Sequence, residues 1–288
     1  MNRQPLRLAV MEAERILAGA GVPSPRVDAE LIAAHVLGVE RGKLMLVPLV
    51  DRQVVEAIGQ LVTRRAKRIP LQHLIGWAAL GPVTVEVGPG VFTPRPETEL
   101  LLEWGLAELT GVPNPLIVDL CTGSGALALA FAAARPDATV HAVELDQRAL
   151  AWARHNADRR AEAGDSPIVL HAGDVSDPAL LADLDGRVDL LVCNPPYVPV
   201  STVVPPEVGE HDPFQAVFAG ADGLSVIPHV VRCAARLLAP GGRFAMEHDE
   251  SHADAVLDLL TTRRVLTDVQ GHPDLAGRPR FATARSRA

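Results

Sequence analysis

The chain has 288 residues, of which 48% are hydrophobic and 22% are charged, and its formal net charge is −8 at pH 7. This composition excludes a disordered chain, because enough apolar surface can be buried to offset the entropy lost on folding. The acidic balance argues against a protein that coats nucleic acid. The three cysteines form no CxxC pair, which excludes a zinc knuckle and a disulfide framework and favours reduced thiols in the cytoplasm.

The first 75 residues differ from the rest in charge and in periodicity. Eleven Lys and Arg against seven Asp and Glu give them a net charge of +4, whereas the remainder carries −12. Apolar residues recur at helical spacing in 6–18, 28–37 and 54–66, which predicts a small helical bundle with no strand before residue 80. For the basic run at 64–68 two interpretations stay open, a solvated last helical turn or a surface that binds a partner.

Residues 76–95 read as a connector. Residues 81–92 alternate apolar and polar around Gly88-Pro89-Gly90, which is typical of a β-hairpin that turns there. Beyond it, strand-like and helical runs alternate, which predicts an α/β domain with a mostly parallel sheet. The strand-like runs are 116–120, 139–145, 168–172, 188–193 and 243–247, and the helical runs are 125–134, 147–159, 224–238 and 253–262.

A glycine loop joins the first of these strands to a helix. Gly123 and Gly125 let the backbone turn tightly and approach a ligand at the carboxyl edge of the sheet. Glu144 ends the next strand, nineteen residues after Gly125, where a carboxylate can accept both hydroxyls of a ribose. The pattern predicts an adenosine-bearing ligand and does not separate NAD from S-adenosylmethionine.

Two further carboxylates favour the methyl donor over NAD. Asp119 lies inside the glycine strand, where its charge suits a sulfonium and an amino group better than a pyrophosphate. Asp174 follows the third strand, where it can meet the adenine amino group. The alternative for Asp119 is a carboxylate that stabilises the loop by accepting hydrogen bonds from backbone N–H groups.

The most informative motif is Asn194-Pro195-Pro196-Tyr197, at the end of the fourth strand. The two prolines fix φ and remove two N–H donors, so the Asn194 side chain and the Pro195 carbonyl can both point into a cleft. Two acceptors suit the two N–H groups of a planar –NH₂, and Tyr197 supplies a flat wall beside it. Such a nitrogen is a poor nucleophile, so holding it in line with a methyl group aids transfer without a strong general base.

Two other patterns invite a different chemistry. The H-x-x-x-H at His248 and His252 straddles a strand end and a helix start, so we expect a solvated loop there and no metal site. Cys193 reads as a small buried strand residue rather than a nucleophile.

At this point the sequence resembles the release factor glutamine N5-methyltransferases, the HemK/PrmC family of class I S-adenosylmethionine-dependent enzymes. The likeness covers nearly the whole chain. Because residues 194–197 are shared with adenine-N6 DNA methyltransferases and some RNA enzymes, the more specific motifs are PLQHLIG at 70–76 and GVFTPRPETE at 90–99. The tail DLAGRPR at 274–280 also looks like the family's ending.

The resemblance implies a helical domain over 1–75 that grips the substrate, a β-hairpin linker over 76–95, and a Rossmann-like methyltransferase domain with a mostly parallel seven-stranded sheet over 96–288. It implies methyl transfer from S-adenosylmethionine to the amide nitrogen of the glutamine in the Gly-Gly-Gln motif of bacterial class I peptide chain release factors, with S-adenosylhomocysteine as product. We expect a cytoplasmic monomer without stable nucleic-acid or membrane binding.

The resemblance also implies roles for individual residues. Asn194 and Pro195 would hold the glutamine amide together with Pro196 and Tyr197, while Glu144 would hold the ribose. Residues near the donor and the target would be Phe92, Pro94 and Arg95. The remaining residues expected to bind the cofactor are Asp119, Cys121, Thr122, Gly123, Ser124 and Gly125 of the loop, Leu145, Asp174 and Val175 beside the adenine, and Asn194 itself.

Three positions depart from the family pattern, and three other functions compete with it. Cys121 stands where glycine is usual, Glu144 where aspartate is common, and Val175 where some members have an aromatic residue. An adenine-N6 DNA or RNA methyltransferase is disfavoured by the −12 charge and by the absence of a target-recognition insert. An NAD-dependent oxidoreductase leaves residues 194–197 unexplained, and the intact Asn194 argues against a non-catalytic adenosine-binding adaptor.

Overall fold

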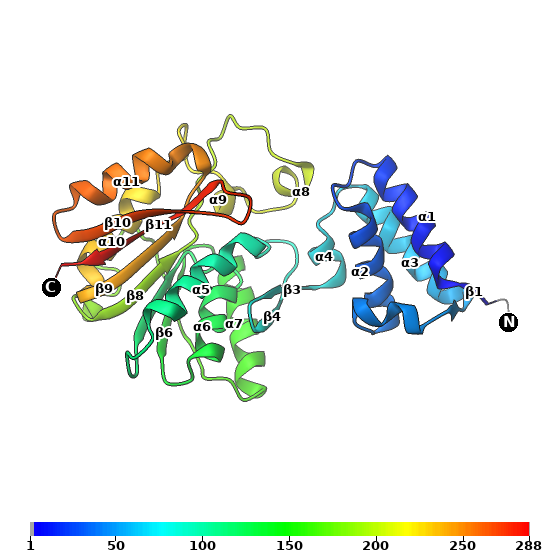
Figure 1. Cartoon of the computed structure of the whole chain (residues 1–288), viewed down its shortest axis with the longest axis horizontal. Coiled ribbons are helices and arrows are strands. Elements are labelled where there is room, and N and C mark those ends of the chain that lie inside the picture. The colour runs from blue at the N-terminus through cyan, green and yellow to red at the C-terminus, as the bar shows by residue number, and fades with distance from the viewer. Residues whose placement is uncertain (1–2, 288) are drawn as a thin grey trace. The chain divides into compact units, whose positions relative to one another are not determined.

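A computed structural model describes residues 3–287, which divide into two compact units (Figure 1). The first unit runs to Trp77 and also takes in Val204–His211, and the second comprises Ala78–Val203 with the chain from Asp212 onward. No helix between residues 3 and 287 is long and apolar enough to cross a membrane.

The first unit is the helical bundle that the periodicity predicts. Its buried core is formed by apolar residues such as Leu17, Ile32 and Ile58. The expectation of no strand before residue 80 is wrong, because two short strands pair beside the helices and a third begins at Trp77. The elements are β1 (Gln4–Pro5), α1 (Leu6–Gly19), α2 (Pro25–Leu37), the 3₁₀ helix η1 (Arg41–Leu46), β2 (Leu49–Val50), α3 (Arg52–Ala66), α4 (Leu71–Ile75) and α8 (Pro206–Gly209).

Ion pairs inside the first unit account for half of the basic run. Arg65 is 5% exposed and contacts both Asp28 (2.7 Å) and Glu207 of α8 (2.8 Å). Arg68 donates to both carboxylate oxygens of Glu207, at 2.7 and 2.6 Å. Arg65 is therefore not the solvated side chain that a last helical turn would present, and the two arginines explain why residues 204–211 group with this unit.

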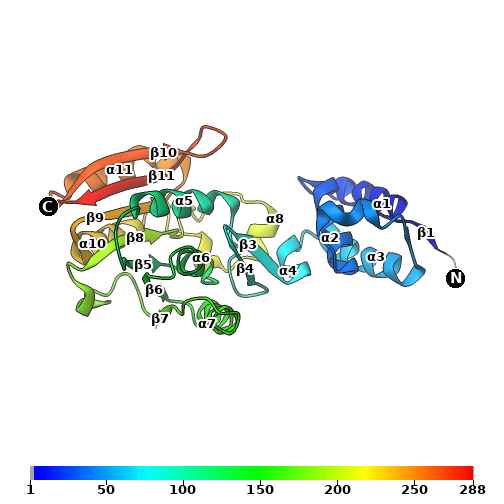
Figure 2. The ribbon, with the colours of Figure 1, turned by 60° about the horizontal axis from the view of Figure 1, so that its bottom comes forward.

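The second unit is built on a seven-stranded sheet in the order β10-β11-β9-β8-β5-β6-β7. Strands β9, β8, β5, β6 and β7 run parallel to one another, while β11 pairs antiparallel with both β9 and β10. This confirms the predicted α/β class and mostly parallel sheet. Figure 2 shows β7 at one edge and β10 at the other. The strands are β5 (Leu116–Leu120), β6 (Thr139–Glu144), β7 (Val169–Ala172), β8 (Val188–Cys193), β9 (Leu238–Glu247), β10 (Leu266–Pro273) and β11 (Pro279–Ser286).

Helices cover both faces of this sheet, because successive strand residues point to opposite sides. Ile117 packs in one buried cluster with α5, α6 and α7, whereas its neighbour Val118 packs in another with α10 and α11. The helices are η2 (Pro96–Thr98), α5 (Glu99–Glu108), α6 (Ala126–Ala134), α7 (Gln147–Glu162), η3 (Ala182–Leu184), α9 (Phe214–Val217), α10 (Ile227–Leu237), η4 (Glu250–His252) and α11 (Ala253–Thr262).

The connector forms a two-stranded sheet, but its turn lies elsewhere than expected. The strands are β3 (Trp77–Leu80) and β4 (Val83–Glu86), so the chain turns at Gly81-Pro82 and not at Gly88-Pro89-Gly90. Gly81 adopts a φ of +53°, which suits glycine. Beyond Gly90, Pro94 and Pro96 lack the N–H groups that a second hairpin strand would need.

The close packing of α5 on the sheet yields a stability prediction. A Cβ added to Gly105 would lie 2.8 Å from Cζ of Phe131 and 2.9 Å from Cδ2 of Leu190. We therefore expect Gly105→Ala to lower the free energy of unfolding by about 1–3 kcal/mol, since overpacking exceeds the gain in helix propensity. Urea denaturation followed by circular dichroism measures the change.

The matched control is Gly59→Ala in α3. A Cβ there meets no described atom within 4 Å, so this variant should be as stable as the wild type or more so. Equal effects of the two substitutions would contradict the packing argument.

Candidate active site

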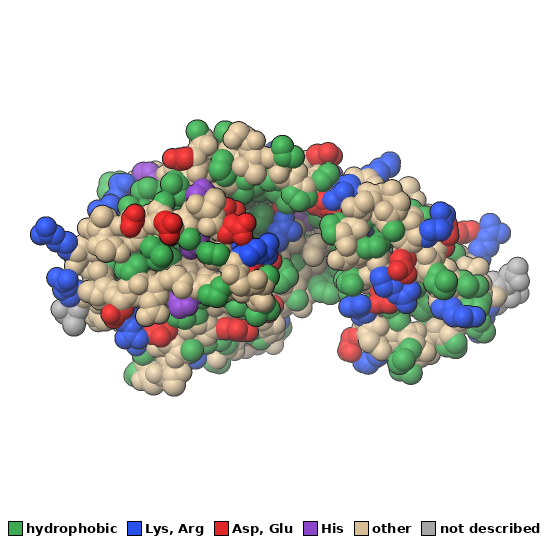
Figure 3. Space-filling model, turned by 45° about the horizontal axis from the view of Figure 1, so that its top comes forward, with side chains coloured by type: hydrophobic (Ala, Val, Ile, Leu, Met, Phe, Trp, Pro, Cys, Tyr) green, Lys and Arg blue, Asp and Glu red, His purple; other side chains and the backbone are tan. Residues whose placement is uncertain are grey.

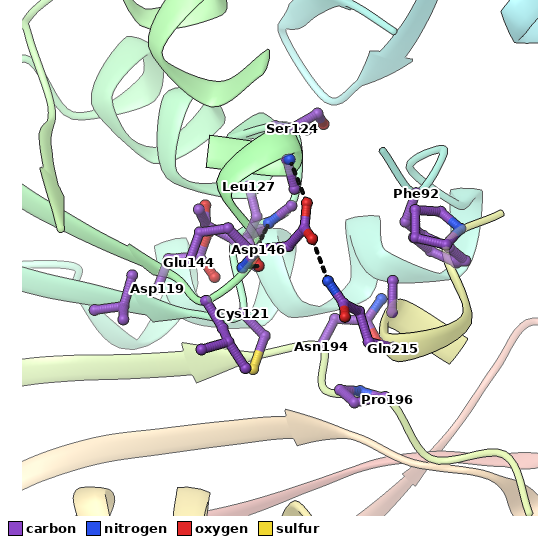
Figure 4. A pocket seen from close by; sticks show the side chains of 18 of the residues that line it. Phe92, Asp119, Cys121, Ser124, Leu127, Glu144, Asp146, Asn194, Pro196 and Gln215 are labelled. Atoms are coloured by element: carbon purple, nitrogen blue, oxygen red, sulfur yellow. Dashed lines mark hydrogen bonds between the residues drawn. The ribbon is translucent and has the colours of Figure 1, made fainter. Parts of the chain in front are cut away.

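A pocket in the second unit opens where β5, β6 and β8 end (Figure 4). It brings together most residues that the sequence singled out. Those at its wall are Phe92, Pro94, Asp119, Cys121, Thr122, Gly123, Ser124, Glu144, Leu145, Asp174, Val175, Asn194 and Pro196. Four other expected site residues do not line the pocket in the described part of the chain: Arg95, Gly125, Pro195 and Tyr197.

The glycine loop turns through three residues with positive φ. Gly123 and Gly125 have φ values of +59° and +81°, and Cys121 has +59°. Glycine adopts this region freely, whereas an L side chain there costs on the order of 1–2 kcal/mol. Cys121, which stands where the family pattern has glycine, therefore strains the backbone at the start of the loop.

Asp119 is a loop-holding carboxylate in this geometry. It is 1% exposed, and its Oδ2 accepts a 2.6 Å hydrogen bond from the Thr122 hydroxyl. Burial raises the pKa of Asp119 to about 7. The Thr122 hydroxyl bond gives Asp119 a loop-stabilising role. Because the side chain also lies at the pocket wall, its role toward a cofactor stays a prediction.

The Glu144 carboxylate accepts hydrogen bonds from backbone N–H groups of two different segments at the pocket. Its Oε2 accepts from Gly123 N at 2.8 Å and its Oε1 from Asp146 N at 2.9 Å. Burial raises the pKa of Glu144, and these hydrogen bonds oppose that shift. The carboxylate is thus held between the glycine loop and the start of α7, with a lone pair on each oxygen left for a hydroxyl donor.

Asp146 and Gln215 meet at this pocket and were missed by the sequence reasoning. Asp146 caps α7, since its Oδ1 accepts from the N–H groups of Arg148 and Ala149. Its other oxygen accepts from Nε2 of Gln215, which is carried by α9 (Figure 4). An aspartate directly before a helix is a typical N-cap, so this pattern could have indicated Asp146. No sequence motif indicates Gln215.

Asn194 sits at the wall with its amide already engaged. Its Nδ2 donates to Oγ1 of Thr98 at 3.0 Å, and the Thr98 hydroxyl donates to Glu247 at 2.9 Å. Tyr197 is not among the described residues that line the pocket, and its hydroxyl donates to Glu247 at 2.8 Å. The flat wall beside the target stays a prediction. Burial raises the pKa of Tyr197, so this side chain stays a protonated phenol.

Phe92 lines the pocket, and Arg95 contacts it from outside the pocket wall. The Arg95 guanidinium lies 4.7 Å from the centre of the Phe92 ring and pairs with Asp212 at 2.6 Å. Burial raises the pKa of Asp212 to about 6, and the charge of Arg95 opposes that shift. Arg95 therefore supports the segment that carries Phe92 and Pro94 rather than lining the pocket itself.

Cys193 and the two histidines stay outside the pocket chemistry. Cys193 is fully buried, which raises the pKa of its thiol and makes it a poor nucleophile. His248 and His252 are also buried rather than in a solvated loop, which corrects that expectation. Among residues 3–287, no group of three or more His, Cys, Asp or Glu side chains could hold a metal ion.

Comparisons with known proteins match both units. A model of the "PrmC N-terminal domain" matches residues 9–76, and one of the "methyltransferase small domain" matches residues 83–205. The chain is 54% identical over 280 residues to a protein of Mycolicibacterium smegmatis named release factor glutamine methyltransferase, with 97% of each chain covered. Proteins of the same name from Mycobacterium tuberculosis and Streptomyces coelicolor are 49% and 48% identical, over 97% and 96% of this chain and 91% and 96% of theirs.

Among solved structures, a T. thermophilus 16S rRNA N2 methyltransferase in complex with AdoMet and guanosine is similar to this chain. The two are 24% identical with a TM-score of 0.52, over 73% of this chain and 50% of the other. This likeness supports the methyltransferase fold of the second unit.

The buried Asp119 gives a prediction about pH. Its pKa is raised from 3.8 to about 7, so the folded protein keeps a proton that the unfolded chain releases. Its contribution to stability is therefore present below pH 4 and is lost as pH rises toward about 7. Relative to Asp119→Asn, we expect the wild-type free energy of unfolding to fall by up to ~4 kcal/mol across that range. Urea denaturation at each pH measures this difference.

An exposed aspartate supplies the control, because Asp158→Asn should follow the wild-type pH profile. Parallel profiles for the wild type and Asp119→Asn would show that this carboxyl is not the titrating group.

Proposed function

The chain belongs to the release factor glutamine methyltransferases, and we propose that it methylates the side-chain amide of the glutamine in the Gly-Gly-Gln motif of bacterial class I release factors. The observation that carries this proposal is Asn194, which stands at the pocket wall with its –NH₂ engaged by Thr98. Its carbonyl oxygen is left to accept from the –NH₂ of a target.

The pocket fits S-adenosylmethionine as the methyl donor. When bound, this cofactor supplies an electrophilic methyl group on a sulfonium. Glu144 would accept the ribose hydroxyls, since its position is fixed by two backbone N–H groups. The loop from Cys121 to Gly125 would surround the methionine end, and Asp174 with Val175 would border the adenine.

The proposed transfer requires no general base beside Asn194. The amide nitrogen of glutamine is weakly nucleophilic, because its lone pair is delocalised into the carbonyl. Asn194 Oδ1 and the Pro195 carbonyl would accept its two N–H groups, and both hydrogen bonds strengthen as the nitrogen becomes cationic. Tyr197 keeps its proton and donates a hydrogen bond to Glu247, so it does not serve as the base. The methylated nitrogen is acidic enough to lose its proton to water.

We assign the grip on the release factor to the first unit. The net charge of +4 on residues 1–75, which form most of this unit, supports this. So do its exposed apolar side chains, among them Met45 and Leu46, which are 84% and 74% exposed. Figure 3 shows Lys and Arg side chains mixed with hydrophobic ones on the face of this unit in view. The three free cysteines fit an enzyme that acts in the cytoplasm.

The cofactor assignment predicts the effect of Glu144→Ala. Loss of a charge-assisted acceptor should weaken binding of S-adenosylhomocysteine by about 1.5–3 kcal/mol in isothermal titration calorimetry. Glu103→Ala, at an exposed position of α5, should bind as the wild type does. Heat from NAD and none from S-adenosylhomocysteine would refute the assignment.

The amide assignment predicts the effect of Asn194→Ala. Removal of one preorganised acceptor should lower kcat by about 10²–10³, with little change in affinity for S-adenosylhomocysteine. Asn194→Asp keeps an acceptor of the same size and should retain more activity than alanine. Labelled S-adenosylmethionine, offered with separate pools of release factor, DNA and RNA, measures turnover.

Mass spectrometry of the release factor should place the added methyl on the glutamine of its Gly-Gly-Gln motif. Label in the DNA or RNA pool alone would instead support a nucleic-acid methyltransferase, and unchanged turnover of Asn194→Ala would overturn the role of Asn194.

A further inference from the structure

Behind Asn194 lies a chain of three hydrogen bonds that ends on one buried carboxylate. Asn194 donates to Thr98 (3.0 Å), Thr98 donates to Oε2 of Glu247 (2.9 Å), and Tyr197 donates to Oε1 of Glu247 (2.8 Å). Thr98 and Glu247 are 5% and 1% exposed. The participants come from η2, the end of β9 and the loop after β8, so three segments distant in sequence converge here.

The number of hydrogens fixes the direction of this chain. A hydroxyl has one proton, and Thr98 uses it on Glu247, so its oxygen can only accept from Asn194. Asn194 must then turn its –NH₂ toward Thr98, which leaves Oδ1 as the outward atom. No residue between 3 and 287 donates to Oδ1.

The charge at Glu247 sustains that direction. Burial raises the pKa of this carboxyl, while the hydrogen bonds from Tyr197 and Thr98 and the positive charge of Arg280 oppose the shift. In this arrangement the carboxylate accepts at both oxygens, at Oε2 from Thr98 and at Oε1 from Tyr197. Both hydroxyl protons therefore point at Glu247.

We propose that Thr98 and Glu247 are positioning residues, which hold the Asn194 amide in the one orientation that presents Oδ1 to the target –NH₂. The inference rests on the proposed function, because it concerns the amide that receives the target nitrogen. In the opposite orientation the Asn194 –NH₂ would face the target –NH₂, donor against donor, and the in-line geometry would be lost. The pair acts on turnover through Asn194 and touches neither reacting group.

Replacement of the Thr98 hydroxyl tests this directly. Thr98→Val keeps the shape of the side chain and removes the hydrogen bond, so kcat should fall by about 10–100-fold, the scale of losing a group that orients a ligating side chain. KM for the release factor and affinity for S-adenosylhomocysteine should stay within about twofold. Thr98→Ser restores the hydroxyl and should recover most of the turnover. Thr98→Ala removes the hydroxyl without adding bulk and replaces the valine variant if that one is unfolded by circular dichroism.

Thr93→Val is the matched control. Thr93 is also fully buried, and its hydroxyl has no hydrogen-bond partner among residues 3–287, so the same chemical change should leave kcat as in the wild type. A loss at Thr93 equal to that at Thr98 would show that the effect reflects packing and would overturn the proposal.

A double-mutant cycle separates positioning from mere support of the fold. In an Asn194→Ala background there is no amide to orient, so Thr98→Val should lower kcat by less than about twofold further. The full loss in that background, or wild-type kcat in the single Thr98→Val variant, would overturn the proposal. Should the wild type methylate only DNA or RNA, the proposed function fails, and the same cycle on that substrate still decides the positioning role, since those targets also present an –NH₂.

Discussion

The parallel pairing of β5 with its two neighbours is the constraint on which the site depends. Leu120 stands level with Val143 of β6 and with Cys193 of β8. Because parallel strands end at the same edge, the residues that follow these three positions must emerge side by side. Cys121, Glu144 and Asn194 are those residues, and a slip of the register would part the cofactor side of the pocket from the acceptor of the target.

Sequence patterns predicted the helices and strands that are buried in the core. Runs such as Val188–Cys193 show their burial in composition alone, and the glycine turn and the Asn194 motif mark the ends of strands. Contacts between segments distant in sequence left no such signal. Thr98 lies in the motif at 90–99 that carries the family resemblance, but its hydrogen-bond partner Glu247 is 149 positions away in the sequence. The alternating run contains Gly81 as well as Gly90, and the predicted turn lay at the second of these glycines instead of the first. Only the prolines that follow Gly90 distinguish the two positions in the sequence.

Carboxylates at the site accept hydrogen bonds from fixed donors. Asp119 is bound by the Thr122 hydroxyl, Glu144 by two backbone N–H groups, and Glu247 by two hydroxyls. Burial raises the pKa of each, and fixed donors oppose the shift. Such groups orient neighbours and bind hydroxyls. This arrangement suits a transfer in which the proton leaves the nitrogen after the bond has formed, since nothing near the target must remove it beforehand.

The pairing of Glu207 with Arg65 and Arg68 has a consequence for the order in which the protein is made. Glu207 lies 139 positions after Arg68, so the ribosome has synthesised most of the second unit before this partner emerges. Until then Arg65 has only Asp28 to neutralise it. The nascent bundle therefore begins with an incomplete ion-pair network, and its last stabilising contact arrives only after the strand that precedes Asn194 has been translated. The N-terminal unit matures late although its helices are the first to leave the ribosome.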